Sequence, residues 1–314
     1  MALVLILGCR AQQTPTGVLP GAECWYLPAP DGVCELFVME FGTGSPVVVL
    51  HGGPGADLTY MLPIANGLDS THRFVFYDQR GSLRSPCPTD SISMRKHVLD
   101  LEALRMALGL EKLDLVSHSA GTLLAYEYLA AFPKRVGAFV LVGGLPHKNG
   151  WAYFDKEYST LWEGLQDSAS AFENRPAVAS VLDSLSRIGS ANRAKRATQL
   201  ALIRQVGAES VRVDKWVEAM PMRVNAAASD ATRKTTNFDY DYSALLANHS
   251  AQVVVINGDL DFVVGPRGSP LWKSLSATAS NVIVNVIPDA GHIVWRDRPE
   301  LFRRCLRTAL ARKN

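Results

Sequence analysis

The stretch LDLVSHSAGTLLAYEYLAAF, residues 113–132, decides the fold of this chain. Residues 113–116 predict a buried strand, and the residues after Gly121 carry apolar side chains at helical spacing. Ser119 lies in the tight turn between them, where small residues are required two positions to either side. Gly121 meets this requirement, and Ser117 stands where glycine is usual. The context is that of a nucleophile elbow, in which a serine hydroxyl projects above the edge of a sheet.

Ser119 is the predicted nucleophile, and it needs a general base because a serine hydroxyl is a weak nucleophile at neutral pH. His292 follows the last predicted strand and is the predicted base. A carboxylate that orients this base should come between them in the chain. Asp261, three residues past Gly258, is the predicted acid. Asp259 is the alternative, and otherwise it braces the loop.

Two backbone N–H groups are predicted to stabilise an oxyanion. The N–H of Ala120 lies at the start of the predicted helix, where amide groups point toward an anion. The sequence HGGPG, residues 51–55, directly follows the apolar run 46–50. Glycines let a backbone approach a substrate carbonyl closely, so the N–H of Gly53 is the second predicted donor.

Composition excludes several other classes of protein. The 314 residues carry 32 Lys and Arg against 30 Asp and Glu, a formal net charge of +2, and 47% are apolar. A disordered chain would be less apolar and more highly charged, and a nucleic-acid partner calls for a basic excess that is missing here. The apolar runs are shorter than the roughly 20 residues that each span of a polytopic membrane protein requires. Five cysteines are too few for a disulfide scaffold.

No cofactor is expected either. The seven histidines are scattered along the sequence, without the spacing of metal ligands, and no dinucleotide-binding fingerprint is present. The predicted chemistry needs neither a metal ion nor an organic cofactor.

Strand and helix patterns alternate along most of the chain. Predicted strands cover residues 34–41, 46–50, 74–77, 113–116, 138–142, 253–256 and 282–287, and predicted helices cover 92–108, 122–132 and 301–310. Residues 146–235 show helical periodicity only. The sequence therefore predicts an α/β fold with a mostly parallel sheet flanked by helices. The predicted core comprises residues 23–145 and 236–314, with residues 146–235 inserted as a helical cap.

The N-terminal residues 1–22 have two interpretations. The run MALVLILG before Cys9 resembles the end of a bacterial lipoprotein signal, and residues 10–22 would then form a tether. Lipidated Cys9 would be the only membrane attachment, and the protein would belong to the cell envelope or periplasm. The segment has no basic n-region and is short for a signal, so a cytoplasmic protein is the alternative. Cys24 and Cys34 flank a predicted turn. They could form a disulfide across it or remain two separate thiols.

Three motifs together resemble a known family. They are HGGPG at 51–55, DQRG at 78–81 with Arg84-Ser85 following, and the elbow at 117–121. The chain resembles the α/β-hydrolase superfamily over residues 35–145 and 236–312, and within it the prolyl iminopeptidase-like branch, peptidase family S33. The resemblance implies the α/β-hydrolase fold, serine-hydrolase chemistry and a helical cap. It also implies that residues 78–81 brace the loops around the site.

The resemblance has departures that concern specificity. Leu83 stands where the branch usually has glycine, and the elbow lacks the GGSWG form of true prolyl iminopeptidases. Members of the branch bind the substrate ammonium with acids of the cap, one of them in a Trp-Glu-Gly context. Trp162-Glu163-Gly164 looks similar but comes sooner after the elbow, and it makes Trp162 and Glu163 the candidate substrate-binding residues.

Three functions remain open from the sequence. The first is an aminopeptidase of the prolyl iminopeptidase type acting on a small or short-peptide substrate. The second is a carboxylesterase or lactonase, and the third is a hydrolase-fold binding protein without catalysis. The oligomeric state is open as well.

Overall fold

The computed structural model describes residues 19, 21–148, 224–261, 263, 264 and 268–311, with the isolated residues 174, 176, 179 and 183. Cys9, Trp162 and Glu163 lie outside the described residues, as do most of the predicted cap and tether. Within the described part of the chain, no helix combines the length and the apolar character of a membrane span.

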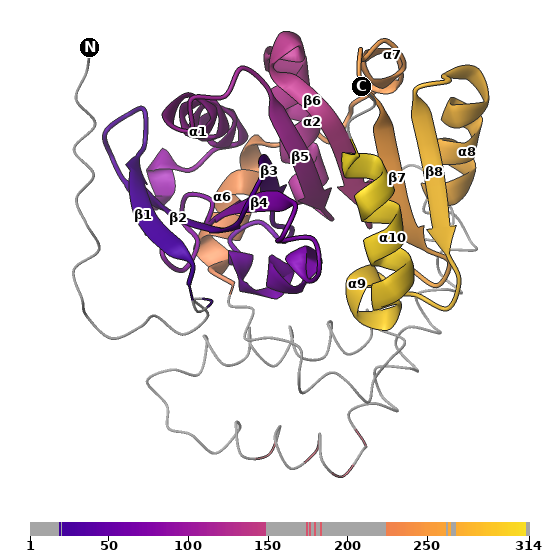
Figure 1. Ribbon diagram of the computed structural model, residues 1–314. Helices are drawn as coiled ribbons and strands as arrows, with labels where there is room; N and C mark the ends of the chain where they lie inside the picture. Colours follow the sequence, from indigo (N-terminus) through magenta and orange to yellow (C-terminus); the bar gives the residue numbers. More distant parts are fainter. Residues whose placement is uncertain are drawn as a thin grey trace.

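The described residues form an eight-stranded sheet at the centre of the molecule (Figure 1). Its strands are β1 (Glu23–Pro28), β2 (Glu35–Gly42), β3 (Ser45–Leu50), β4 (His72–Tyr77), β5 (Leu113–His118), β6 (Val136–Val142), β7 (Val253–Gly258) and β8 (Val282–Ile287). The order across the sheet is β1-β2-β4-β3-β5-β6-β7-β8. Strand β2 is antiparallel to β1 and β4, and the other pairs are parallel. The predicted mostly parallel sheet is confirmed.

Helices cover both faces of this sheet because its inner strands are apolar on both sides. In β3, Val48 and Leu50 belong to one buried cluster, and Val47 and Val49 belong to the other. The first cluster packs under α1 (Met94–Ala107), α2 (Gly121–Ala131), α7 (Ser243–Ala247) and α8 (Gly268–Thr278). The second packs under η1 (Leu58–Ala65), α9 (Val294–Asp297) and α10 (Pro299–Leu310). The other elements in the part of the chain that the structure describes are α6 (Ala226–Thr235), η2 (Thr89–Ser91) and η3 (Pro133–Arg135).

Helix α1 illustrates how local signals set the element boundaries. It begins two residues later than the apolar periodicity predicts, because Ser93 is the N-cap and its hydroxyl accepts the N–H of Lys96. It ends where Gly109 adopts a left-handed φ of 67°, which lets the chain reverse. The N–H of Leu110 then donates to the carbonyl of Arg105 and closes the last turn.

Strand β1 was not among the predicted strands, although the turn predicted between Cys24 and Cys34 is present and joins β1 to β2 as an antiparallel hairpin. It lies at the edge of the sheet, and its side chains do not alternate regularly between a buried and an exposed face: only Leu27 is buried. Cys24 in this strand pairs in register with Met39, five residues after Cys34. That offset corresponds to about 17 Å along the strand, beyond the reach of a disulfide. The two cysteines are separate thiols in the structure.

A buried ion pair ties the β1–β2 hairpin to α1. Arg80 is 1% exposed and donates from Nε and Nη2 to both carboxylate oxygens of Asp100, at 2.7 and 2.6 Å. Its Nη1 also donates to Asp31 Oδ2 at 2.9 Å. Burial opposes the charge of Arg80, but the hydrogen bonds to Asp100 and Asp31 raise its pKa above the ordinary value. Arg80 thus braces the β1–β2 hairpin against α1.

Asp100→Asn keeps the shape of the side chain but leaves the guanidinium of Arg80 without its main counter-charge. Because that guanidinium is buried, we expect the free energy of unfolding to fall by about 3–5 kcal/mol, measured by urea denaturation. Lys96→Ala is the control, since Lys96 forms a partly exposed pair with Asp31. It should cost less than about 1 kcal/mol. Equal losses in the two variants would contradict this account.

Candidate active site

Residues from four separate loops meet at one edge of the sheet. Gly53 follows β3, Ser119 and Ala120 follow β5, Asp261 follows β7, and His292 follows β8. These strands are parallel, so their carboxyl ends lie at the same edge. Strands β3 and β5 are neighbours, although β3 connects to β4 on its other side. The loops of Gly53 and Ser119 therefore flank the topological switch point, where ligands bind in open α/β sheets.

The backbone of Ser119 is strained and firmly held. Its φ of 52° lies in the left-handed region, which side chains other than glycine rarely adopt. Its N–H donates to the carbonyl of Val142 at 3.1 Å, and its carbonyl accepts the N–H and the hydroxyl of Thr122 at 2.9 and 2.7 Å. A Cβ atom at Gly121 would lie 2.6 Å from the backbone oxygen of His51, so only glycine fits there. Such over-determined strain is typical of functional sites.

His292 and Asp261 form a buried pair beside this turn. His292 Nδ1 lies 2.9 Å from Asp261 Oδ2, and both residues are at most 2% exposed. A carboxylate only accepts hydrogen bonds, so Nδ1 carries the proton and Nε2 presents its lone pair. The imidazole centroid lies 4.5 Å from that of His118, the residue before Ser119. This pairing is the arrangement that orients a general base.

The two candidate carboxylates have different partners. The other oxygen of Asp261 accepts the N–H groups of Val263 and Val264 at 3.0 and 3.2 Å. Asp259 instead accepts the N–H of Ala290 at 3.3 Å and is half-buried. Asp261 is therefore the carboxylate that accepts a hydrogen bond from the imidazole of His292, and Asp259 accepts one from the backbone of the loop before His292.

The HGGPG loop packs directly on the elbow. A Cβ atom at Gly52 would lie 2.7 Å from the Cβ of Ser119. The N–H of Gly52 donates to Tyr60 Oη at 2.5 Å and is therefore already engaged. Gly53, with a φ of 60°, starts a turn that the N–H of Ala56 closes on its carbonyl. After the engaged N–H of Gly52, the N–H of Gly53 is the next backbone donor along this loop.

Residues in the segment 78–81 hold this loop in place through hydrogen bonds. The N–H of Gln79 donates to His51 Nε2 at 3.1 Å, and its side-chain amide donates to the His51 carbonyl at 2.9 Å. Asp78 accepts from the N–H of Leu58 and from the guanidinium of Arg84, at 2.8 and 3.0 Å. Burial lowers the pKa of His51, which keeps its ring neutral and able to accept from Gln79.

Sequence reasoning missed two side chains at this edge. His118 Nδ1 lies 2.8 Å from Tyr60 Oη, and both residues are 2% exposed. A histidine on an apolar strand and a tyrosine in an apolar run look like core residues from the sequence. The only available signal was that His118 directly precedes Ser119.

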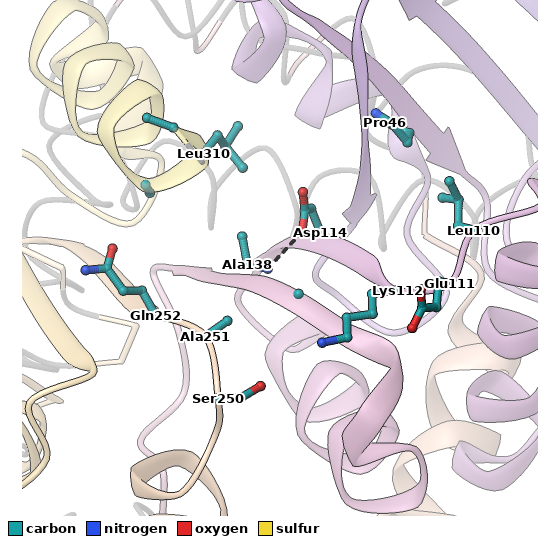
Figure 2. Close-up of a pocket in the computed structure, with 13 residues that line it drawn as sticks. Pro46, Leu110, Glu111, Lys112, Asp114, Ala138, Ser250, Ala251, Gln252 and Leu310 are labelled. Carbon is teal, nitrogen blue, oxygen red and sulfur yellow. Dashed lines mark hydrogen bonds between the residues drawn. The ribbon is translucent and has the colours of Figure 1, made fainter. Parts of the chain in front are cut away.

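A separate cavity of about 780 Å³ lies at the opposite edge of the sheet (Figure 2). Its lining includes Pro46 at the start of β3 and Gln252 just before β7, so it opens at the amino ends of the strands. Asp114 accepts the N–H of Ala138 within it at 2.8 Å. None of the predicted site residues lines this cavity. Among the described residues, no cluster of His, Cys, Asp and Glu is arranged to hold a metal ion.

Comparison with known proteins establishes the family. The family model described as alpha/beta hydrolase fold matches residues 45–299, so the chain belongs to the α/β hydrolase fold family. A proline iminopeptidase from Heyndrickxia coagulans is 36% identical over 103 residues, which cover 32% of this chain. The matched stretch spans 35% of that curated relative's own length. The sequence resemblance to this superfamily and to its prolyl iminopeptidase-like branch is confirmed.

Solved structures agree on the fold. A proline iminopeptidase-related protein from Thermus thermophilus has a TM-score of 0.62 at 24% identity, covering 92% of this chain and 97% of that one. A thermophilic esterase from Thermogutta terrifontis has a TM-score of 0.60 at 22% identity, with coverages of 92% and 98%. At these identities, the similarity shows a shared fold.

The buried histidines of this edge should make folding stability depend on pH. Burial and the neighbouring His292 hold the pKa of His118 well below its ordinary value, and burial lowers that of His51. Below about pH 6.5 the unfolded chain takes up protons that these folded side chains do not, so stability falls as pH falls. Each such histidine contributes a slope of up to about 1.4 kcal/mol per pH unit.

We therefore expect His118→Gln to have a shallower loss of unfolding free energy than the wild type between pH 7.5 and 5.5. Urea denaturation at several pH values measures both slopes. Parallel slopes would show that His118 does not resist protonation in the folded state.

Proposed function

We propose that this protein is a serine hydrolase that cleaves an ester or amide bond of a small substrate through an acyl-enzyme. The observation that carries the proposal is the buried His292–Asp261 pair, at 2.9 Å, at the same sheet edge as the strained Ser119. The family membership supports it, because the elbow of this fold presents its nucleophile in this way.

In the proposed mechanism, Ser119 Oγ attacks the substrate carbonyl carbon while His292 Nε2 accepts its proton. The Gly53 and Ala120 N–H groups donate hydrogen bonds to the oxyanion that develops on the carbonyl oxygen. Asp261 stabilises the imidazolium that results. His292 then gives the proton to the leaving group as its bond to the carbonyl carbon breaks. Water, activated by the same imidazole, hydrolyses the acyl-enzyme and restores Ser119.

The proposed substrate class is a short peptide or related small amide with a free N-terminus. Its support is the set of motifs shared with the prolyl iminopeptidase-like branch and the name of the curated relative. In this proposal, residues 146–235 form a cap over the core of residues 23–145 and 236–314. Glu163 would pair with the substrate ammonium, and Trp162 would contact its side chain.

A second candidate is a carboxylesterase or lactonase. It is supported by Leu83 and by the elbow sequence, both of which depart from the prolyl iminopeptidase pattern. The solved esterase from Thermogutta terrifontis shares this fold, and its name supports the second candidate. A binding protein without catalysis is the remaining alternative.

A serine-reactive phosphonate should label the wild type on Ser119, as detected by intact mass and peptide mapping. Ser119→Ala should not be labelled. Ser117→Ala is the matched control, because Ser117 lies two residues before Ser119, in β5, and its hydroxyl donates to the carbonyl of Val140. It should be labelled like the wild type. An unlabelled wild type, or a labelled Ser119→Ala, would contradict the proposed chemistry and favour the binding protein.

The same assay distinguishes the two carboxylates. Asp261→Asn should slow labelling by about 10³–10⁴-fold, because the imidazole loses its orienting charge. Asp259→Asn should stay within a few-fold of the wild type. The reverse result would move the acid role to Asp259.

Parallel assays with aminoacyl-naphthylamides, the prolyl compound included, and with short-chain p-nitrophenyl esters test the substrate class. The peptidase proposal predicts that naphthylamides are hydrolysed and that Glu163→Gln raises KM more than it lowers kcat, because an ammonium contact made in the ground state is lost. Hydrolysis of esters alone would contradict the peptidase proposal and favour the second candidate.

A further inference from the structure

A buried imidazole beside the proposed nucleophile joins two loops of the site. His118 is the last residue of β5. Its Nδ1 lies 2.8 Å from Tyr60 Oη, and its Nε2 lies 3.2 Å from the backbone oxygen of His292. Tyr60 Oη in turn accepts the N–H of Gly52 at 2.5 Å. A chain of hydrogen bonds therefore runs from the loop after β3 to the loop after β8.

The direction of each hydrogen bond between Gly52 and His292 follows from which groups can donate and which can only accept. The carbonyl of His292 can only accept, so His118 Nε2 must carry the proton. In the neutral ring Nδ1 is then an acceptor, and the hydroxyl of Tyr60 must donate to it. The phenolic oxygen accepts from Gly52, whose N–H can only donate. Burial and the nearby His292 hold the pKa of His118 well below its ordinary value, which keeps the ring in this neutral form.

Aromatic packing fixes the imidazole in place. The ring of Trp295 stands nearly perpendicular to that of His118, at 81° and with centroids 4.8 Å apart. Trp295 also contacts Tyr60, with centroids 6.1 Å apart, and the centroid of the His292 ring lies 4.5 Å from that of His118. All four side chains are at most 4% exposed. Rotation of His118 would break both of its hydrogen bonds in an apolar environment, which is costly.

We propose that His118 is a positioning residue. It holds the loop of residues 51–55, which carries the proposed oxyanion donor Gly53, in place relative to the loop of the general base His292. The inference rests on the proposed function, since it concerns the distance between the Gly53 N–H and the imidazole of His292. Gly52, which Tyr60 and His118 hold, directly precedes Gly53. The backbone of His292 is held by the same ring from the other side. A displacement of about 1 Å between such groups can cost on the order of 100-fold in rate.

The test uses the phosphonate again but separates its binding constant, KI, from its rate of reaction, kinact. Tyr60→Phe removes only the hydroxyl that links Gly52 to His118, and His118→Leu removes both links of the imidazole. We expect kinact to fall about 10-fold and about 100-fold respectively, with KI nearly unchanged, because the catalytic groups move while the pocket remains. His118→Asn retains an acceptor near the position of Nδ1, so it should recover part of the rate lost in His118→Leu.

Tyr128→Phe is the control for a lost buried hydroxyl, because Tyr128 is fully buried in α2 and donates to Glu102. Its kinact should stay within about twofold of the wild type. The inference is overturned if folded Tyr60→Phe reacts at the wild-type rate, or if Tyr128→Phe slows as much as Tyr60→Phe does. A labelled wild type with unaffected variants contradicts this inference alone. A wild type that is not labelled overturns the proposed function and this inference with it.

Discussion

The left-handed backbone of Ser119 is the constraint on which the rest of the site depends. A non-glycine residue with a φ of 52° is unfavourable, and it persists here because Val142 and Thr122 bind its amide and carbonyl. Those partners require β5 and β6 to be adjacent and in register, and they require α2 to start immediately after the turn. The close approach of Gly121 to β3 fixes the neighbouring HGGPG loop relative to the hydroxyl.

The sheet converts residues far apart in the sequence into neighbours. His292 and Asp261 lie 31 residues apart and meet because β7 and β8 are parallel neighbours whose following loops share an edge. His118 and Tyr60 lie 58 residues apart and meet because β5 is adjacent to β3, which leads into η1. The carboxyl edge therefore carries the proposed chemistry, while the cavity at the amino edge lies apart from it.

Prediction from the sequence succeeded where one local pattern decided the outcome. Inner strands such as β3 and β7 are apolar on both faces, and the elbow is a contiguous strand, turn and helix. The turn before β2 was predicted, but strand β1 itself was not, because the side chains of this edge strand do not alternate regularly between two faces. Sequence could not distinguish Asp261 from Asp259 by their contacts, because both follow the same strand and only the tertiary position of His292 separates them. His118 was missed for the same reason, since its partners Tyr60 and His292 come from η1 and from the loop after β8.

A crystal structure of the protein after reaction with the phosphonate would test the proposed roles of Ser119, His292 and the two amides most directly. We expect a covalent bond between phosphorus and Ser119 Oγ. We also expect a phosphoryl oxygen within hydrogen-bond distance of the Gly53 and Ala120 N–H groups. His292 Nε2 should lie beside Ser119 Oγ, the oxygen that bonds to phosphorus. Phosphorus attached elsewhere, or a phosphoryl oxygen pointing away from both amides, would contradict these roles.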